Sequence, residues 1–226
     1  MMSRSSSGGP ILQIRRSGVV LCASGKEVKR LRAEFKRNHC VCLRKFLEPA
    51  LLKFVLDKLD GTRFRKRIDR INVEDYVPQN AAMTLLELVL NDPELFRAVR
   101  RLTGCRPIGS FLGKGLWRLV PGRGHTIRWH SDRVEDRTIQ LDISLTQKRY
   151  RGGTLQFRNS RSGRILHEVD RMALGDAVLI RLASGLEHRF APVQGPWARI
   201  AYDGWFFSTA DHRASLKGKL TRLKER

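Results

Sequence analysis

The sequence predicts a mainly β protein of the α+β class, in which helices come first and an antiparallel β core follows. Up to residue 104, apolar residues recur at helical spacing in several segments of the 226-residue chain. From Arg106 onward, short runs rich in Val, Ile, Leu, Thr and aromatic residues alternate with glycine and proline, which is typical of an antiparallel sandwich or barrel. We therefore expect one domain over residues 26–208, with helical support over 26–104 and the β core over 105–208.

Four segments of the helical part carry their own signals. Residues 26–37 place apolar side chains at helical spacing among charged ones, and residues 49–59 begin at a proline and end before a glycine. Residues 80–91 and 92–102 indicate two more helices. Asp92 has the residue type of an N-cap and precedes a proline, so it marks the start of the fourth helix.

Both ends of the chain are expected to lie outside this domain. Residues 1–25 indicate a flexible basic extension, whose short apolar run falls below the ~7–15 residues of a secretory signal core. Residues 209–226 form a basic tail with leucines at helical spacing, as in a docked amphipathic helix. No apolar run approaches the ~18 residues of a transmembrane helix, so we expect a cytoplasmic protein without membrane contact.

The four cysteines predict neither a zinc site nor a disulfide framework. Cys40 and Cys42 form a C-x-C pair, and no second Cys or His pair at zinc spacing follows them. Residues 39–43 have the composition of a strand, on which both thiols would share one buried face. We expect free, structural cysteines.

The net charge of +22 is far from that of an ordinary cytoplasmic enzyme. Basic residues gather at 63–67, 148–151 and 158–164, and such a surface attracts polyanions in a salt-dependent way. The alternative is that the arginine content reflects composition and solubility, since no helix-turn-helix, zinc-finger or RNA-binding signature accompanies it. Both interpretations stay open.

Four residues of the β part form the strongest functional pattern. His130 and Asp132 are an H-x-D pair whose side chains would point to one face of an extended segment, and His188 follows at a distance. Two imidazoles and one carboxylate are the ligand set of the facial triad that holds non-haem Fe(II). Arg199, on a predicted strand, would bind an anion such as a carboxylate bidentately.

Each of these residues also has a purely structural interpretation. Asp132 would form a turn with an Asx hydrogen bond, and His188 would be a structural histidine. Arg199 would need an anionic partner inside a barrel because an unpaired buried charge is costly, and Asp142 or Asp203 is the protein alternative to a ligand.

Further motifs accompany this pattern in a fixed order. They are His130-Ser131-Asp132, Gly-Gly-Thr-Leu-Gln-Phe at 152–157, Gly175-Asp176, His188 with Pro192-Val193, then Arg199 and Trp205-Phe206. In this order, the stretch 116–207 resembles the iron(II)/2-oxoglutarate-dependent dioxygenases, and among them the prolyl 4-hydroxylase-like branch.

The resemblance implies a double-stranded β-helix, or jelly roll, with supporting helices. It implies that His130, Asp132 and His188 ligate Fe(II), and that 2-oxoglutarate chelates the iron while Arg199 pairs with its far carboxylate. Molecular oxygen would be the second co-substrate and ascorbate a reductant. The implied reaction couples oxidative decarboxylation of 2-oxoglutarate to hydroxylation of a C–H bond.

Two departures from the family pattern concern the co-substrate. Where several relatives have a tyrosine before the H-x-D motif, this chain has Trp117 and Arg118. A second 2-oxoglutarate anchor would then come from one of three other polar residues: Thr138, Gln140 or Ser144. The gap from His188 to Arg199 is also one residue longer, and Arg189 is the nearest rival, but its strand phase beside His188 would point it away.

The sequence leaves several substrates open. The branch resemblance favours a protein, peptide or amino acid, with proline the first candidate. The charge favours a nucleic acid or a ribosome-associated target, for which residues 63–67 with Phe64 are a candidate platform and a solvated loop the alternative. A small-molecule substrate and a non-catalytic binding module of the same fold are the remaining alternatives.

Overall fold

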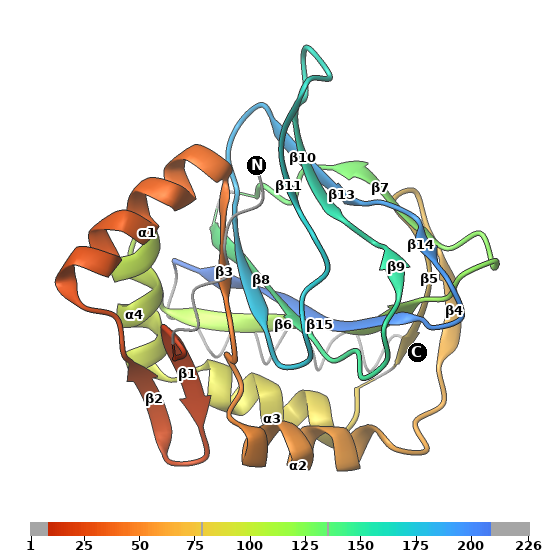
Figure 1. Ribbon diagram of the computed structural model, residues 1–226, viewed down its shortest axis with the longest axis horizontal. Coiled ribbons are helices and arrows are strands. Elements are labelled where there is room, and N and C mark those ends of the chain that lie inside the picture. The colour runs from red at the N-terminus through yellow and green to blue at the C-terminus, as the bar shows by residue number, and fades with distance from the viewer. Residues whose placement is uncertain (1–8, 78, 135, 209–226) are drawn as a thin grey trace.

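The computed structural model describes residues 9–77, 79–134 and 136–208, with all helices before residue 104 and most strands after it (Figure 1). The helices are α1 (Gly25–Asn38), α2 (Pro49–Leu59), α3 (Ala81–Leu90) and α4 (Pro93–Thr103). The strands are β1 (Leu12–Arg15), β2 (Gly18–Leu21), β3 (Cys40–Leu43), β4 (Arg65–Ile68), β5 (Asn72–Val77), β6 (Ser110–Leu119), β7 (Thr126–His130), β8 (Arg137–Ser144), β9 (Arg151–Gly152), β10 (Leu155–Asn159), β11 (Ile165–Val169), β12 (Ala177–Arg181), β13 (Leu186–Phe190), β14 (Val193–Gln194) and β15 (Arg199–Phe207).

Most of these strands belong to one antiparallel sheet that curls over on itself. Its order is β11-β10-β13-β7-β5-β6-β15-β8-β12-β3, and β4 pairs with β5 at the side. Strand β5 joins the two walls because it pairs with both β6 and β7. Apolar side chains from β7, β10 and β13 pack against those from β6 and β12, so the walls face each other around a common interior.

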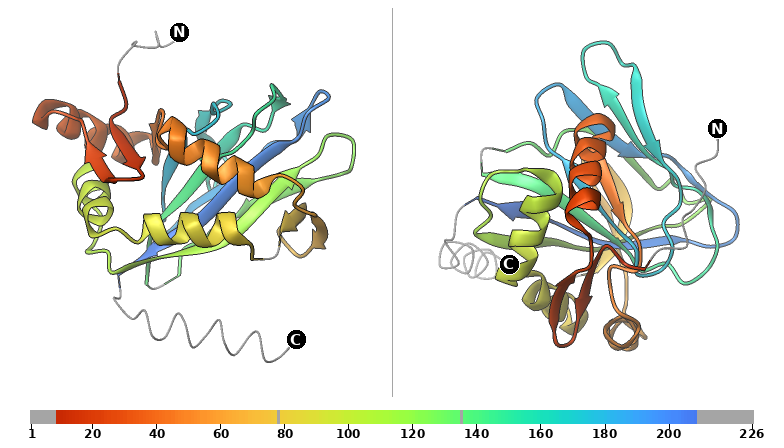
Figure 2. Two further views of the ribbon diagram at one scale, coloured as in Figure 1. Left: turned by 90° about the horizontal axis from the view of Figure 1, so that it is seen from below. Right: turned by 60° about the vertical axis from the view of Figure 1, so that its left-hand side comes forward.

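The four predicted helices are confirmed to within two residues at each end, and their caps explain why. At α1, the Ser24 side chain accepts from the Glu27 backbone N–H, while the Glu27 carboxylate accepts from Ser24 N, which completes a capping box. Asn80 caps α3 by accepting from the Met83 backbone N–H, and Asp92 caps α4 by accepting from the Glu94 backbone N–H. Helix α4 ends at Gly104, whose φ of 72° is left-handed. Helix α1 packs on α4 and α2 on α3 (Figures 1 and 2).

Alternation along β8 divides the molecule into two cores. One face of this strand packs under the helices and the other points into the barrel. Each apolar side chain on the helix side contributes about 1.5–3 kcal/mol by burial. That face therefore stabilises the strand while the other one carries polar groups inside. The helix-side residues are Ile139, Leu141 and Ile143; the barrel-side residues are Thr138, Gln140, Asp142 and Ser144.

The flexible extension expected over residues 1–25 is wrong for its described part. Strands β1 and β2 pair as an antiparallel hairpin, and Leu12 and Ile14 are fully buried in the helix-side core. Ile14 also exchanges backbone hydrogen bonds with residues 46 and 48. Alternating apolar residues between Ile11 and Leu21 carried this strand signal, and the glycine and serine around them obscured it. The basic tail predicted for 209–226, and residues 1–8, lie outside the described residues.

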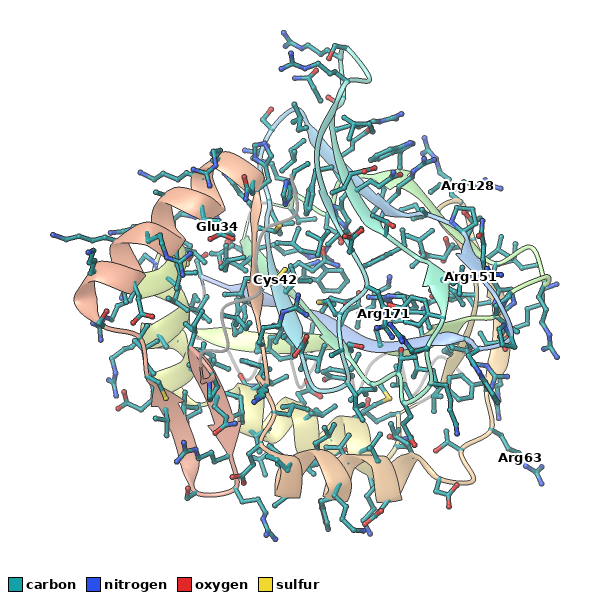
Figure 3. All side chains as sticks on the ribbon, viewed as in Figure 1. Glu34, Cys42, Arg63, Arg128, Arg151 and Arg171 are labelled. Atoms are coloured by element: carbon teal, nitrogen blue, oxygen red, sulfur yellow. The ribbon has the colours of Figure 1, made fainter. Side chains whose placement is uncertain are left out.

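The basic cluster at 63–67 is not the solvated loop that was its structural interpretation. Its second half belongs to β4, and Arg67 forms an ion pair with Glu74, a fully buried residue of β5. Figure 3 shows Arg63 pointing outward, away from the body of the molecule.

The cysteines behave as expected. Cys40 and Cys42 lie on β3 and face the same side, Cys40 is buried, and all four thiols of the described chain are free. Burial raises the pKa of Cys42 to about 11, so its thiol stays protonated. Among the described helices, none has the length and apolarity that crossing a membrane would require.

Candidate active site

Three of the predicted site residues meet at one end of the barrel. His130 is the last residue of β7 and lies directly opposite His188 of β13 in the ladder. Asp132 follows two residues later, where the chain leaves the strand. Its Oδ2 lies 3.7 Å from Nε2 of His130 and 3.7 Å from Nε2 of His188. One ligand atom from each residue lies within 4.8 Å of the others.

Hydrogen bonding prepares His130 for coordination. Its Nδ1 lies 2.8 Å from the carbonyl oxygen of Arg128, which can only accept. The Nδ1 atom therefore carries the proton, and the lone pair of Nε2 is directed at the site. The Asx turn considered as an alternative for Asp132 is not what its side chain forms, because its carboxylate faces the two imidazoles and Arg137.

Electrostatics holds His188 and Asp132 in ligating protonation states. Burial, assisted by the neighbouring His130, lowers the pKa of His188 to about 3, so this imidazole is neutral. Burial alone would raise the pKa of Asp132, but the neighbouring His130 and His188 outweigh burial and hold that pKa well below its usual range.

Orphaned atoms test whether a metal fits. Asp132 Oδ2 and His188 Nε2 are buried and have no hydrogen-bond partner in the described part of the protein. Buried polar atoms of this kind cost free energy unless something binds them. Two imidazole nitrogens and a carboxylate oxygen are the donor set of a non-haem Fe(II) site, so the residues present fit that ion.

Arg137 contacts both the carboxylate and the backbone of Asp132. Its Nη1 lies 3.6 Å from Asp132 Oδ1, and the same nitrogen donates to the Asp132 carbonyl oxygen at 3.3 Å. The guanidinium stacks on the Trp205 ring, 3.7 Å from its centroid. Arg137 is the first residue of β8. The end of the barrel that carries His130, Asp132 and His188, called the metal end below, is therefore where β8 begins.

Arg199 lies in the same interior, farther from the metal cluster. Its guanidinium lies between the rings of Phe190, at 4.0 Å, and Trp117, at 4.6 Å. Nη2 donates to Asp142 Oδ1 at 2.7 Å, and both side chains are almost completely buried. Of the two protein acids considered as partners, the structure has Asp142. The rival Arg189 points outward, as expected, and stacks on Trp129.

Only one of the two terminal nitrogens of the Arg199 guanidinium, Nη2, has a hydrogen-bond partner in the described structure. Its Nη1 is buried and without a partner in the described structure, as are Asp142 Oδ2 and the Ser144 hydroxyl. Burial would lower the pKa of Arg199, but Asp142 and a hydrogen bond with Tyr150 outweigh it, so the guanidinium stays charged. A carboxylate placed at Nη1 would satisfy this nitrogen, so the pocket has one free donor for an anionic ligand.

The other proposed anchors are arranged differently. Thr138 donates to the carbonyl oxygen of Phe206, and Gln140 donates to Asp203. Trp117 donates its Nε1–H to Asp203 at 3.1 Å. Among the three candidates, Ser144 alone combines a buried hydroxyl without a partner and a cross-strand position beside Ala201, two residues from Arg199.

Two interior residues escaped the sequence analysis. Tyr150 follows β8 in a loop and reaches Arg199, and Lys114 interrupts the β6 register and lies 3.8 Å from Asp203. Neither has a motif. The glycines on both sides of Lys114 were the one available signal, because a bulge of the ladder often needs glycine.

Comparison with solved structures shows the fold. A Pseudomonas putida prolyl-4-hydroxylase superposes with a TM-score of 0.59 and 17% identity, covering 80% of this chain and 99% of that one. A 2OG-Fe(II) oxygenase family protein from Burkholderia pseudomallei gives 0.58 and 17%, covering 87% and 96%. A Trichoplax adhaerens prolyl hydroxylase in complex with a hypoxia inducible factor peptide gives 0.55 and 15%, covering 81% and 90%.

No protein-family model and no curated protein matches the sequence. At these identities the likeness establishes the fold, and the predicted jelly-roll core with N-terminal helices is confirmed. The likeness to the two prolyl hydroxylases is thus one of architecture.

Proposed function

We propose that this chain is an Fe(II)- and 2-oxoglutarate-dependent dioxygenase that hydroxylates a C–H bond in a protein, peptide or amino acid. The observation that carries the proposal is the convergence of His130, Asp132 and His188, with two orphaned ligand atoms, at one end of the jelly roll. A structural cluster would have satisfied those atoms from within the protein.

The residues divide the work as follows. His130, Asp132 and His188 hold Fe(II), and Arg199 binds the far carboxylate of 2-oxoglutarate. Bound iron and 2-oxoglutarate supply the oxidative chemistry, in which 2-oxoglutarate, O2 and R–H become succinate, CO2 and R–OH. Phe190 and Trp117 flank the guanidinium and exclude water from the carboxylate site, which strengthens a charged hydrogen bond there.

A peptide-like substrate is supported by the fold neighbours. Two of them are named prolyl hydroxylases, and one was solved with a peptide bound. Ascorbate is proposed as the reductant that keeps the iron ferrous. The free cysteines of the described chain support a reducing, cytoplasmic location.

A nucleic acid or ribosome-associated target is the second candidate, and one surface favours it. Lys148, Arg149 and Arg151 are exposed beside Trp197, which is 46% exposed and stacked with Lys148. Basic groups next to an exposed aromatic ring suit a single-stranded polynucleotide. Figure 3 shows Arg151 on the same side of the molecule as Arg128.

The test of the proposed activity is anaerobic loading of the full chain with Fe(II) and 2-oxoglutarate, followed by succinate measurement after oxygen is admitted, with ascorbate present. We expect slow succinate formation without substrate, and its loss in Asp132→Ala. His167→Ala, a half-buried histidine outside the triad, is the matched control. Absence of succinate together with absence of Fe(II) binding would favour the non-catalytic binding module.

The substrate class is tested separately. Proline-containing peptides, oligonucleotides and small 2-oxoglutarate-oxygenase substrates are compared for stimulation of succinate formation. A polynucleotide substrate would stimulate turnover at low salt and lose the effect steeply as salt rises. A substitution that removes Trp197 would weaken that stimulation and leave a peptide-driven reaction unchanged.

A further inference from the structure

Asp142 lies between the metal end of the barrel and the base of Arg199. Strand β8 begins at Arg137, which contacts the metal-site acid Asp132, and continues inward through Asp142 to Ser144. Ser144 pairs with Ala201, so the backbone of Arg199 is farther along the barrel still. The Arg199 side chain therefore reaches back past Ser144 to meet Asp142.

A co-substrate that joins the metal to Arg199 must therefore pass Asp142. In the proposed function, the 2-oxo acid end of 2-oxoglutarate is at the metal and its far carboxylate is at the guanidinium. That far carboxylate would arrive at an arginine whose Nη2 already donates to the carboxylate of Asp142. One guanidinium would then face two carboxylates in a dry interior, where like charges repel strongly.

No other free cation faces Asp142 from the described elements packed around it. Across the ladder on β15 it faces another acid, Asp203, and on β12 it faces the apolar Val178. Lys114 of β6 is engaged by Asp203 at 3.8 Å. Tyr150 brings no positive charge, and its hydroxyl oxygen accepts a hydrogen bond from Arg199. The positive charges of Arg199 and Lys114 are thus already matched by Asp142 and Asp203, and a second carboxylate would add an uncompensated negative charge.

The orphaned atoms offer a solution. Asp142 Oδ2 has no hydrogen-bond partner in the described structure, and neither has Arg199 Nη1. A proton on Oδ2 would turn Asp142 into a hydrogen-bond donor, while its Oδ1 continues to accept from Nη2. Nη1 and the carboxyl O–H would then both donate to one incoming carboxylate.

We propose, on the basis of the function inferred above, that Asp142 takes up one proton from solvent when 2-oxoglutarate binds, and that it then donates a hydrogen bond to the far carboxylate beside Arg199. Binding is therefore coupled to protonation. Asp142 is a co-substrate-binding residue that favours 2-oxoglutarate at lower pH.

The electrostatics of the free protein is consistent with this exchange. Burial, reinforced by Asp203 and opposed by Arg199, raises the pKa of Asp142 to about 6. A second carboxylate at the same guanidinium would raise it further. The proton is thus available near neutral pH, and taking it up becomes harder as the pH rises above 6.

The decisive experiment is calorimetric titration of 2-oxoglutarate into the full chain loaded with Mn(II), in two buffers of different ionisation enthalpy. We expect uptake of about one proton per 2-oxoglutarate at pH 8, and an affinity that falls by up to about tenfold per pH unit between pH 7 and 8.5. The second probe is 2-oxobutyrate, which lacks the far carboxylate and should bind without proton uptake.

Two variants assign the proton. Asp142→Asn should abolish proton uptake and make 2-oxoglutarate affinity independent of pH over the same range. Glu74→Gln, which alters a buried carboxylate that faces Arg67 instead of Arg199, should keep wild-type behaviour. If Asp142→Asn fails to fold, the wild-type titration still decides.

Each outcome bears either on the role of Asp142 or on the proposed dioxygenase function. Tight 2-oxoglutarate binding without proton uptake overturns the role of Asp142 and leaves the proposed function standing. Proton uptake that persists in Asp142→Asn overturns the assignment to this residue. No 2-oxoglutarate binding at any pH, in protein shown to hold Mn(II), overturns both.

Discussion

His130 and His188 lie directly opposite each other across the β7–β13 ladder, with their ring centroids 4.4 Å apart. Directly opposed residues of an antiparallel pair share one face of the sheet, so both imidazoles point into the barrel. Phe157 of β10 lies on the other side of His188. The ladder therefore holds two of the proposed metal ligands in a rigid sheet, and the third, Asp132, comes from the chain that leaves it.

Metal binding should depend on each of these three side chains. We expect His130→Ala and Asp132→Ala to weaken Mn(II) or Fe(II) binding by more than the ~10–100-fold that loss of an outer-shell partner costs. Titration followed by electron paramagnetic resonance of free Mn(II) measures it, and circular dichroism checks that the fold persists. Unchanged affinity in both variants would mean that the ion binds elsewhere; His167→Ala should bind as wild type.

The Arg199–Asp142 pair should behave as a buried ion pair. Arg199→Met leaves the Asp142 carboxylate unpaired, and we expect a loss of about 3–5 kcal/mol in the free energy of unfolding, measured with urea. The loss should be smaller at pH 5 than at pH 8, because a protonated Asp142 carries no charge. The double variant Arg199→Met/Asp142→Leu should recover most of it.

An exposed pair provides the comparison for that experiment. Arg97 and Glu94 form an ion pair on the surface of α4, and both side chains are well exposed. Arg97→Met should change stability by no more than about 0.5 kcal/mol. Equal losses in Arg199→Met and Arg97→Met would contradict the view that burial determines the effect.

His188 should make the metal-free protein less stable as the pH drops below 6.5. The pKa of His188 is about 3 in the folded protein and near 6.5 when it is unfolded. Between these values the unfolded state binds a proton that the native state does not, so acid favours unfolding by up to about 1.4 kcal/mol per pH unit.

Replacing His188 isolates its contribution to the pH dependence of the free energy of unfolding. Urea unfolding of wild type and His188→Gln from pH 7 to pH 4, in the presence of a chelator, should show a shallower pH slope for the variant. Other groups, including Asp142, titrate in both proteins and cancel in the difference. Identical slopes would show that His188 is accessible to protons in the native state.

The N-terminal hairpin should contribute to global stability. Leu12 is fully buried under the helices, so Leu12→Ala should cost about 2–5 kcal/mol in the free energy of unfolding. Leu88, on α3, is 73% exposed, and Leu88→Ala should cost well under 1 kcal/mol. Chemical denaturation compares the two; a negligible effect at Leu12 would return this segment to the status of an extension.

Much of the architecture was predictable from local patterns. The four helices follow from apolar spacing and from caps such as Asp92 and Gly104, because those signals depend on neighbours in the chain. The hairpin from Leu12 to Leu21 was not recognised, since short strands bordered by glycine and serine resemble a linker until a core covers them. Strand β4 was concealed within the basic cluster at 63–67 because three of its four residues are charged and carry no strand-like apolar pattern.

The sequence by itself determined the candidate metal ligands, because H-x-D spacing, a distant histidine and the motif order are properties of the chain. It also placed Arg199 on a strand and named Asp142 among its potential partners. Only the tertiary structure decided that Asp142 is the partner, that Tyr150 and Lys114 enter the interior, and that Nη1 of Arg199 remains open. Which charges meet inside a barrel depends on how strands far apart in sequence are paired and staggered, and local spacing does not encode that register.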